Sequence, residues 1–150
     1  MKDIQTERIS EIILKILQVL GGEVFSKTQL VKLIYLIDVI QSRKGEGNFS
    51  GVRYKRYYYG PYSKDIEEAL SKLEREEQVR ITKKKNFEGD PYYHIKLNPP
   101  VAFNILERDD RKTIEDRMKN LKTLELKKLL DITYNTKEFE EADFGEEITL

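Results

Sequence analysis

Residues Leu30 to Ile40, LVKLIYLIDVI, constrain the fold most, because they are apolar on nearly every side of a helix. A helix that is hydrophobic all round has to be buried among other elements. Its start is marked by Ser26 and Gln29, spaced as a capping box in which each side chain bonds the other residue's free backbone N–H. The sequence therefore predicts a helix over Ser26–Ile40 at the centre of the molecule.

Three polar residues, Lys32, Tyr35 and Asp38, interrupt this apolar helix. Lys32 and Asp38 are six positions apart, so they do not form an i,i+4 pair. A buried carboxylate needs hydrogen-bond partners. We expect Asp38 either to be buried against a tyrosine hydroxyl or an arginine of Arg53–Tyr62, or to lie exposed at the rim of the helix.

The remaining periodicity predicts an α+β fold. Apolar spacings of three and four indicate further helices at residues 4–20, 63–77, 105–121 and 124–134. Alternation in Val79–Lys83 and Tyr92–Leu97 indicates a β-hairpin. We expect a mostly helical, winged-helix-like domain over residues 1–135, whose small antiparallel sheet combines hairpin 79–97 with strand 53–59. Helices 2–20 and 123–134 should pack together on the central helix, and residues 136–150 should form an irregular acidic tail.

The segment Arg53–Ser63, RYKRYYYGPYS, holds five of the nine tyrosines. Gly60-Pro61 is expected to end its strand, because proline has no N–H for a sheet ladder. In one interpretation the rings pack on one side of a small core; in the other they form a rigid aromatic-basic surface that docks a partner protein. The two interpretations are compatible with each other. The candidate partner-binding residues are Arg53, Lys55, Arg56, Tyr57, Tyr59 and Tyr62.

Composition argues against an enzyme. The chain has no cysteine, which excludes disulfides and a thiol nucleophile and fits a reducing cytoplasm. The single histidine, His94, lies between Tyr93 and Ile95 on a predicted strand, where a structural role is favoured. No apolar stretch reaches the roughly 20 residues of a membrane span. We expect no catalysis, no metal, no cofactor and no membrane contact.

The alternative function is that of a winged-helix, DNA-binding transcriptional regulator, because helices followed by a hairpin are the order of a winged helix. The hairpin would contact phosphates through Arg80, Lys83, Lys84 and Lys85. Lys+Arg and Asp+Glu are equal at 27 each, however, and the helix over residues 63–77 carries three basic against six acidic side chains. A helix of that charge is poorly suited to lie among phosphates. We expect weak nucleic-acid binding or none.

Three motifs resemble those of the Panacea (SocA-like) proteins: KLIYLID at 32–38, YGPYS at 59–63, and the Ile66, Leu70 and Leu73 stripe before a hairpin. The late helix at 124–134 is also similar to their C-terminal segment. A sister group of small bacterial and archaeal proteins that shares YGPYS fits equally well. The chain departs from many Panacea members, which carry Trp before and an aliphatic residue after Gly-Pro.

The resemblance implies a non-catalytic, antitoxin-like interaction module, because Panacea-type proteins are similar to antitoxins that bind and neutralise toxins. The partner would then be a protein such as a toxin, and a homodimer is left open. The acidic residues 101–150, with 13 acidic against 9 basic side chains, could add a second contact to a basic toxin.

Any DNA binding should be independent of sequence and carried by the basic hairpin. Replacing Arg80, Lys83, Lys84 and Lys85 together by Ala should abolish it, and its salt dependence should correspond to only a few phosphate contacts. The measurement is a fluorescence-anisotropy titration of duplex DNA at several salt concentrations. Tight binding to one defined operator at physiological salt would contradict this expectation.

Overall fold

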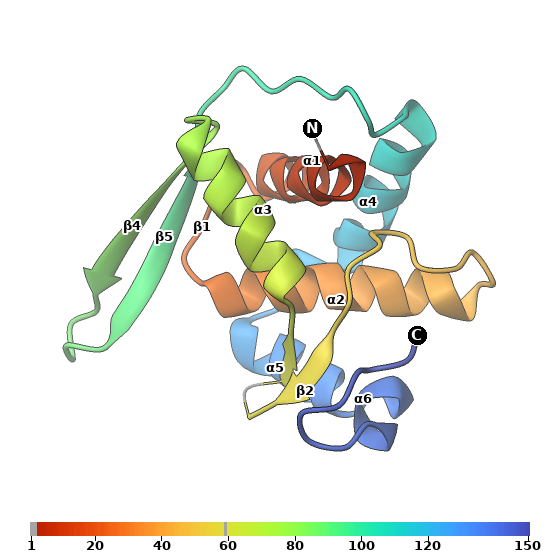
Figure 1. Cartoon of the computed structure of the whole chain (residues 1–150). Coiled ribbons are helices and arrows are strands. Elements are labelled where there is room, and N and C mark those ends of the chain that lie inside the picture. The colour runs from red at the N-terminus through yellow and green to blue at the C-terminus, as the bar shows by residue number, and fades with distance from the viewer. Residues whose placement is uncertain (1–2, 59) are drawn as a thin grey trace.

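The computed structural model describes residues 3–58 and 60–150 and confirms the α+β, mostly helical class (Figure 1). Within those residues the elements, in chain order, are α1 (Ile4–Val19), β1 (Glu23–Val24), α2 (Lys27–Arg43), β2 (Lys55–Tyr57), β3 (Gly60–Tyr62), α3 (Lys64–Arg75), β4 (Val79–Lys85), β5 (Pro91–Leu97), α4 (Arg108–Leu121), α5 (Leu126–Tyr134) and α6 (Lys137–Glu141). The β4–β5 hairpin follows α1, α2 and α3 in the chain, and β2 and β3 lie between α2 and α3.

Helix α2 is buried at the centre, as its apolar composition predicts. Ser26 is its N-cap, and the Ser26 hydroxyl accepts a hydrogen bond of 3.1 Å from the backbone N–H of Gln29. In Figure 1, α2 runs across the middle of the molecule, with α1 and α3 above it and α5 and α6 below it. The expected packing of the first helix on the fifth is wrong: α1 contacts mainly α3 and α4, whereas α5 packs on α2.

The expected single sheet is divided into two. Strand β5 pairs antiparallel with both β1 and β4, so the third strand beside the hairpin is Glu23–Val24 and not the tyrosine strand. Strand β2 instead pairs with β3, with Arg56 opposite Pro61 and Tyr57 opposite Gly60. Gly60-Pro61 therefore belongs to the returning strand of a short hairpin and does not end the strand. Proline is tolerated there because the outer edge of such a strand needs no N–H.

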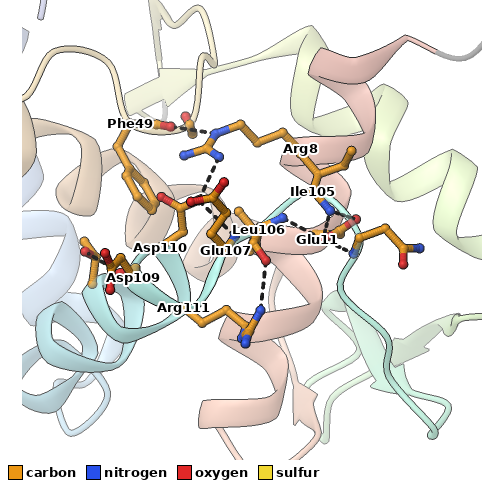
Figure 2. A network of polar contacts seen from close by, with 12 residues as sticks. Arg8, Glu11, Phe49, Ile105, Leu106, Glu107, Asp109, Asp110 and Arg111 are labelled. Atoms are coloured by element: carbon orange, nitrogen blue, oxygen red, sulfur yellow. Dashed lines mark hydrogen bonds and ion pairs between the residues drawn. The ribbon is translucent and has the colours of Figure 1, made fainter.

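A buried carboxylate fixes the long connection between β5 and α4. Glu11 of α1 accepts hydrogen bonds from the backbone N–H groups of Asn104, Ile105 and Leu106, with distances of 3.0–3.1 Å (Figure 2). The guanidinium of Arg111 donates to the carbonyl oxygen of Leu106 at 2.8 Å. Buried polar groups need such partners. The connection is thereby ordered without secondary structure, and it brings α4 against α1.

Arg8 ties the same end of α1 to two other parts of the chain. Its Nε donates to the carbonyl oxygen of Phe49 at 3.0 Å, and its Nη1 lies 3.3 Å from Oδ2 of Asp110 (Figure 2). The Phe49 ring lies under the guanidinium, 5.0 Å from centroid to Cζ. The loop after α2 and the start of α4 are therefore held by one side chain.

Leu33→Ala should lower the free energy of unfolding by about 2–5 kcal/mol, because Leu33 is fully buried in α2 and the variant leaves a cavity. Leu126→Ala, at a half-exposed position of α5, is the matched control and should cost less. Urea unfolding followed by circular dichroism measures both. A loss below about 1 kcal/mol for Leu33→Ala would contradict the central position of α2.

Candidate functional site

The three polar residues that interrupt the apolar stretch of α2, Lys32, Tyr35 and Asp38, contact the tyrosine segment Arg53–Ser63 or residues next to it. Asp38 is fully buried, and its carboxylate accepts hydrogen bonds from the Tyr54 hydroxyl at 2.6 Å, the Ser50 hydroxyl at 2.5 Å and the Ser50 N–H at 2.9 Å. Of the two alternatives for Asp38, the buried one with a tyrosine partner is therefore correct. Burial raises the pKa of the Asp38 carboxyl, and the hydrogen bonds from Ser50 and Tyr54 oppose that rise.

Tyr35 connects the same region to the C-terminal part of the chain. Its hydroxyl and that of Thr136 share a hydrogen bond of 2.8 Å, and its ring meets the Tyr54 ring edge-on at 5.2 Å. Burial raises the pKa of Tyr35 to about 12. Thr136 is also the N-cap of α6. One buried tyrosine of α2 thus positions both Tyr54 and the start of α6.

Lys32 supports the Gly-Pro step of the tyrosine segment. It is 2% exposed, and its Nζ donates to the carbonyl oxygen of Pro61 at 3.5 Å. Gly60 has φ +103°, and a Cβ placed there would come within 2.8 Å of the Lys32 Nζ. The backbone angle is the reason for glycine at this position, and a side chain there would also displace the end of the Lys32 side chain. Burial lowers the pKa of Lys32 to about 8.

The C-terminal tail is not the irregular appendage that the sequence predicts. After α6, residues 143–148 run along β2: the N–H of Gly145 donates to the carbonyl of Arg56 at 2.7 Å, and the N–H of Arg56 donates to the carbonyl of Glu146 at 3.0 Å. The N–H of Ile148 donates to the carbonyl of Tyr54 at 2.9 Å, and Ile148 itself is buried. The tail and the tyrosine segment are therefore one structural unit.

Two of the expected partner-binding cations contact other residues of the same chain. Nη1 of Arg56 donates to the carbonyl oxygens of Phe139 at 3.1 Å, Glu140 at 3.4 Å and Ala142 at 2.8 Å, so Arg56 closes the C-terminal end of α6. Arg53 pairs with Asp65 at 3.2 Å. Lys55 is exposed, and Tyr59 lies outside the described residues.

Besides the charged side chains of Arg53 and Lys55, the segment presents aromatic rings to solvent. Tyr57, Tyr58 and Tyr62 are exposed, and Phe144 of the tail joins them; Tyr58 is 82% and Phe144 53% exposed. The Tyr57 ring meets those of Tyr62 at 5.3 Å and Phe144 at 5.8 Å, and the Tyr58 and Phe144 rings lie 4.5 Å apart. We name these four residues the aromatic surface. Phe144 was missed as a site residue, because nothing in the sequence indicates that the tail returns to β2.

Two shallow hollows flank Tyr57. One, of about 600 Å³, lies between the turn after β2 and residues 139–144, and Tyr58 and Phe144 line it. The other, of about 430 Å³, lies towards α3, and Tyr62 lines it. The aromatic surface therefore borders two hollows, with Tyr57 lining both, and such pockets can receive side chains of a partner.

The other candidate residues lie away from this surface. Arg80, Lys83, Lys84 and Lys85 are exposed on β4, which has β5 as its only partner strand among the described residues. Lysines on an exposed edge also protect a sheet from pairing with other chains. His94 packs flat on Phe25 at 4.8 Å, and its Nε2 lies 2.7 Å from Oε1 of Glu23.

The family model of the antitoxin SocA-like, Panacea domain matches residues 30–139. The chain belongs to this family. The matched range begins in α2 and ends in α6, so it contains Lys32, Asp38 and the tyrosine segment that they support. Neither the curated proteins nor the solved structures provide a match. Among the residues that the structure describes, no helix of this Panacea chain is long and apolar enough to cross a membrane.

Lys32→Met should raise the free energy of unfolding at pH 7, because the folded protein holds a charge in a buried site. The pKa of Lys32 is about 8 in the folded protein against an ordinary 10.5, so the folded protein loses this proton at a lower pH than the unfolded chain does. The free energy of unfolding of the parent protein therefore rises between these two pH values. The advantage of the variant should therefore be largest below pH 8 and shrink by up to about 3 kcal/mol towards pH 10.5.

Guanidinium unfolding of both proteins at pH 7, 8, 9 and 10 measures this difference. Lys44→Met removes an exposed lysine just after the same helix and should leave the free energy of unfolding nearly unchanged. An advantage of Lys32→Met that stayed constant across this pH range would show that Lys32 is not charged in a desolvated site.

Proposed function

We propose that this Panacea chain is a non-catalytic, antitoxin-like module that binds a partner protein through its aromatic surface. The observation that carries the proposal is the contact of four exposed aromatic rings drawn from two distant segments. Single exposed hydrophobic residues are common on proteins, whereas a contiguous group marks an interaction site. Tyrosine and phenylalanine give large contact area at low entropic cost, so they dominate interface energetics.

Rigidity beneath the surface supports the same proposal. Asp38, Tyr35 and Lys32 hold the tyrosine segment from below, and the tail holds it from the side. A surface that is already ordered loses less entropy when a partner binds. The segment is therefore suited to recognition, and the buried polar residues of the KLIYLID motif serve to position it.

The expected binding residues then divide into two roles. Tyr57 and Tyr62 belong to the contact surface, with Lys55 exposed beside them. Arg56 acts as a positioning residue, because its guanidinium is occupied by three backbone carbonyls. Replacing Arg56 would disturb α6 as well as any interface, so it is a poor probe of binding.

We place this binding in the cytoplasm, since a chain without cysteine is suited to a reducing compartment. A toxin is the partner that the family membership favours. Nothing in the structure favours DNA binding over protein binding, and no second function is proposed.

The double variant Tyr58→Ala/Phe144→Ala should lose the partner, because it removes the two most exposed rings of the aromatic surface without touching the buried network. The partner is the protein that co-purifies with the tagged chain from its own cell and arrests growth when expressed alone. Isothermal titration should show at least about a tenfold weaker Kd for the variant, and co-expression of the variant should no longer relieve the arrest.

Phe87→Ala is the matched control, because Phe87 is fully exposed at the tip of the β4–β5 hairpin, outside the aromatic surface. It should bind the partner like the parent protein. A double variant that held the partner as tightly as the parent would overturn the site. Recovery of nucleic acid as the only bound species would overturn the antitoxin-like function itself.

A further inference from the structure

We propose that the hollow between Tyr58, Phe144 and α6 receives a cationic side chain, arginine or lysine, of the partner protein. This inference rests on the proposed function and deepens it, because it names the chemistry that the aromatic surface recognises. The sequence alone suggested an aromatic-basic surface. In the structure, backbone carbonyl oxygens hold Arg56, and Arg53 forms a surface ion pair with Asp65. Glu140 and Asp143 line the hollow beside the aromatic rings.

Most of the described residues that line the hollow are aromatic. The rings of Tyr58 and Phe144 lie 4.5 Å apart with a tilt of 49°, and Tyr57 stands edge-on to Phe144 at 5.8 Å. Tyr134 and Phe139 line the hollow more deeply. Aromatic faces attract cations through their quadrupole, and guanidinium and ammonium groups are the protein cations that use this contact. The hollow of about 600 Å³ has ample room for either side chain.

The charges that line this hollow are complementary to a cation. Glu140 and Asp143 both line it, both are exposed, and neither is ion-paired among the described residues. Among the residues that the structure describes, the one basic residue that lines the hollow is Arg56, whose Nη1 is occupied by backbone carbonyl oxygens and whose guanidinium lies 4.5 Å over the Phe139 ring. The side chains around the hollow are thus net acidic, with two carboxylates against one guanidinium.

The hollow on the other side of Tyr57 lacks this bias. Its charged lining residues are Arg53, Lys55 and Lys64 against Asp65, Glu68 and Glu147, and Arg53 is already paired with Asp65. Equal numbers of opposite charges favour neither a cation nor an anion. Charge complementarity therefore selects the hollow beside Tyr58 and Phe144 as the cation site.

A small probe tests the site without the partner. N-acetyl-arginine amide, titrated into the full chain, should shift the ring resonances of Tyr58 and Phe144 in NMR spectra in a saturable way. N-acetyl-citrulline amide has nearly the same shape without the charge, and it should bind at least about fivefold more weakly. Equal binding of the two probes, or shifts that do not saturate with the arginine probe, would overturn the proposal.

The carboxylates are tested by Glu140→Gln/Asp143→Asn, which should weaken the arginine probe by at least about fivefold while leaving the fold unchanged by circular dichroism. Glu141→Gln is the matched control, because Glu141 is the next residue of α6, carries the same charge and does not line the hollow. It should bind the probe like the parent. Undiminished probe binding by the double variant would count against the acidic rim and overturn the site as described.

The outcome separates this inference from the proposed function. If the partner depends on Tyr58 and Phe144 while the arginine probe does not bind, the cation site fails and the proposed function stands. If the partner is indifferent to both rings, the proposed function fails whatever the probe does, and the cationic contact with the partner fails with it.

Discussion

The buried carboxylate of Asp38 is the interaction on which the functional half of the molecule depends. A carboxylate with no exposed surface is tolerated only with hydrogen-bond donors around it, and here Tyr54 and both donors of Ser50 supply them. Leaving one buried acceptor unsatisfied costs about 1–3 kcal/mol. The requirement fixes the loop after α2 and the start of the tyrosine segment against the central helix, and everything that the segment presents to solvent follows from that placement.

The same network explains why the acidic tail is ordered. Tyr35 reaches Thr136, Arg43 at the end of α2 pairs with Glu138 at 2.7 Å, and Arg56 closes the end of α6. Each contact joins the C-terminal residues to α2 or β2. The tail then completes the aromatic surface with Phe144 and supplies Glu140 and Asp143 to its rim. The acidic tail, which the sequence places apart from the tyrosines, is thus part of the same surface. This surface therefore fits a partner that offers a cationic side chain.

Much of the fold could be predicted, because local patterns report local structure. Helices α1 to α5 and the β4–β5 hairpin follow from periodicity, whereas α6 lies in a tail that was expected to be irregular. The tyrosine partner of Asp38 was one of two expected alternatives. The pairing of strands was wrong: β2 turns back on Gly60–Tyr62 and does not reach the hairpin. The packing of α1 on α5 was wrong as well, since α1 lies mainly on α3 and α4. Both errors concern elements that are far apart in the sequence. The pattern of a strand or an amphipathic helix shows that one of its faces must be covered, but not which distant element covers it.

The sequence by itself determined which helix lies at the centre of the protein, because a helix that is apolar all round is stable only when it is buried. A charged group inside such a helix also has few acceptable partners. Tertiary structure alone decided which side chains of the tyrosine segment are free. Arg56 looks like a binding residue in the sequence, yet its partners are backbone carbonyls 83 to 86 positions away. Every residue carries such a carbonyl, so no sequence signal marks it as the partner of an arginine. Phe144 joins the aromatic surface for the same reason: the path of the tail is set by backbone hydrogen bonds that any side chain would permit.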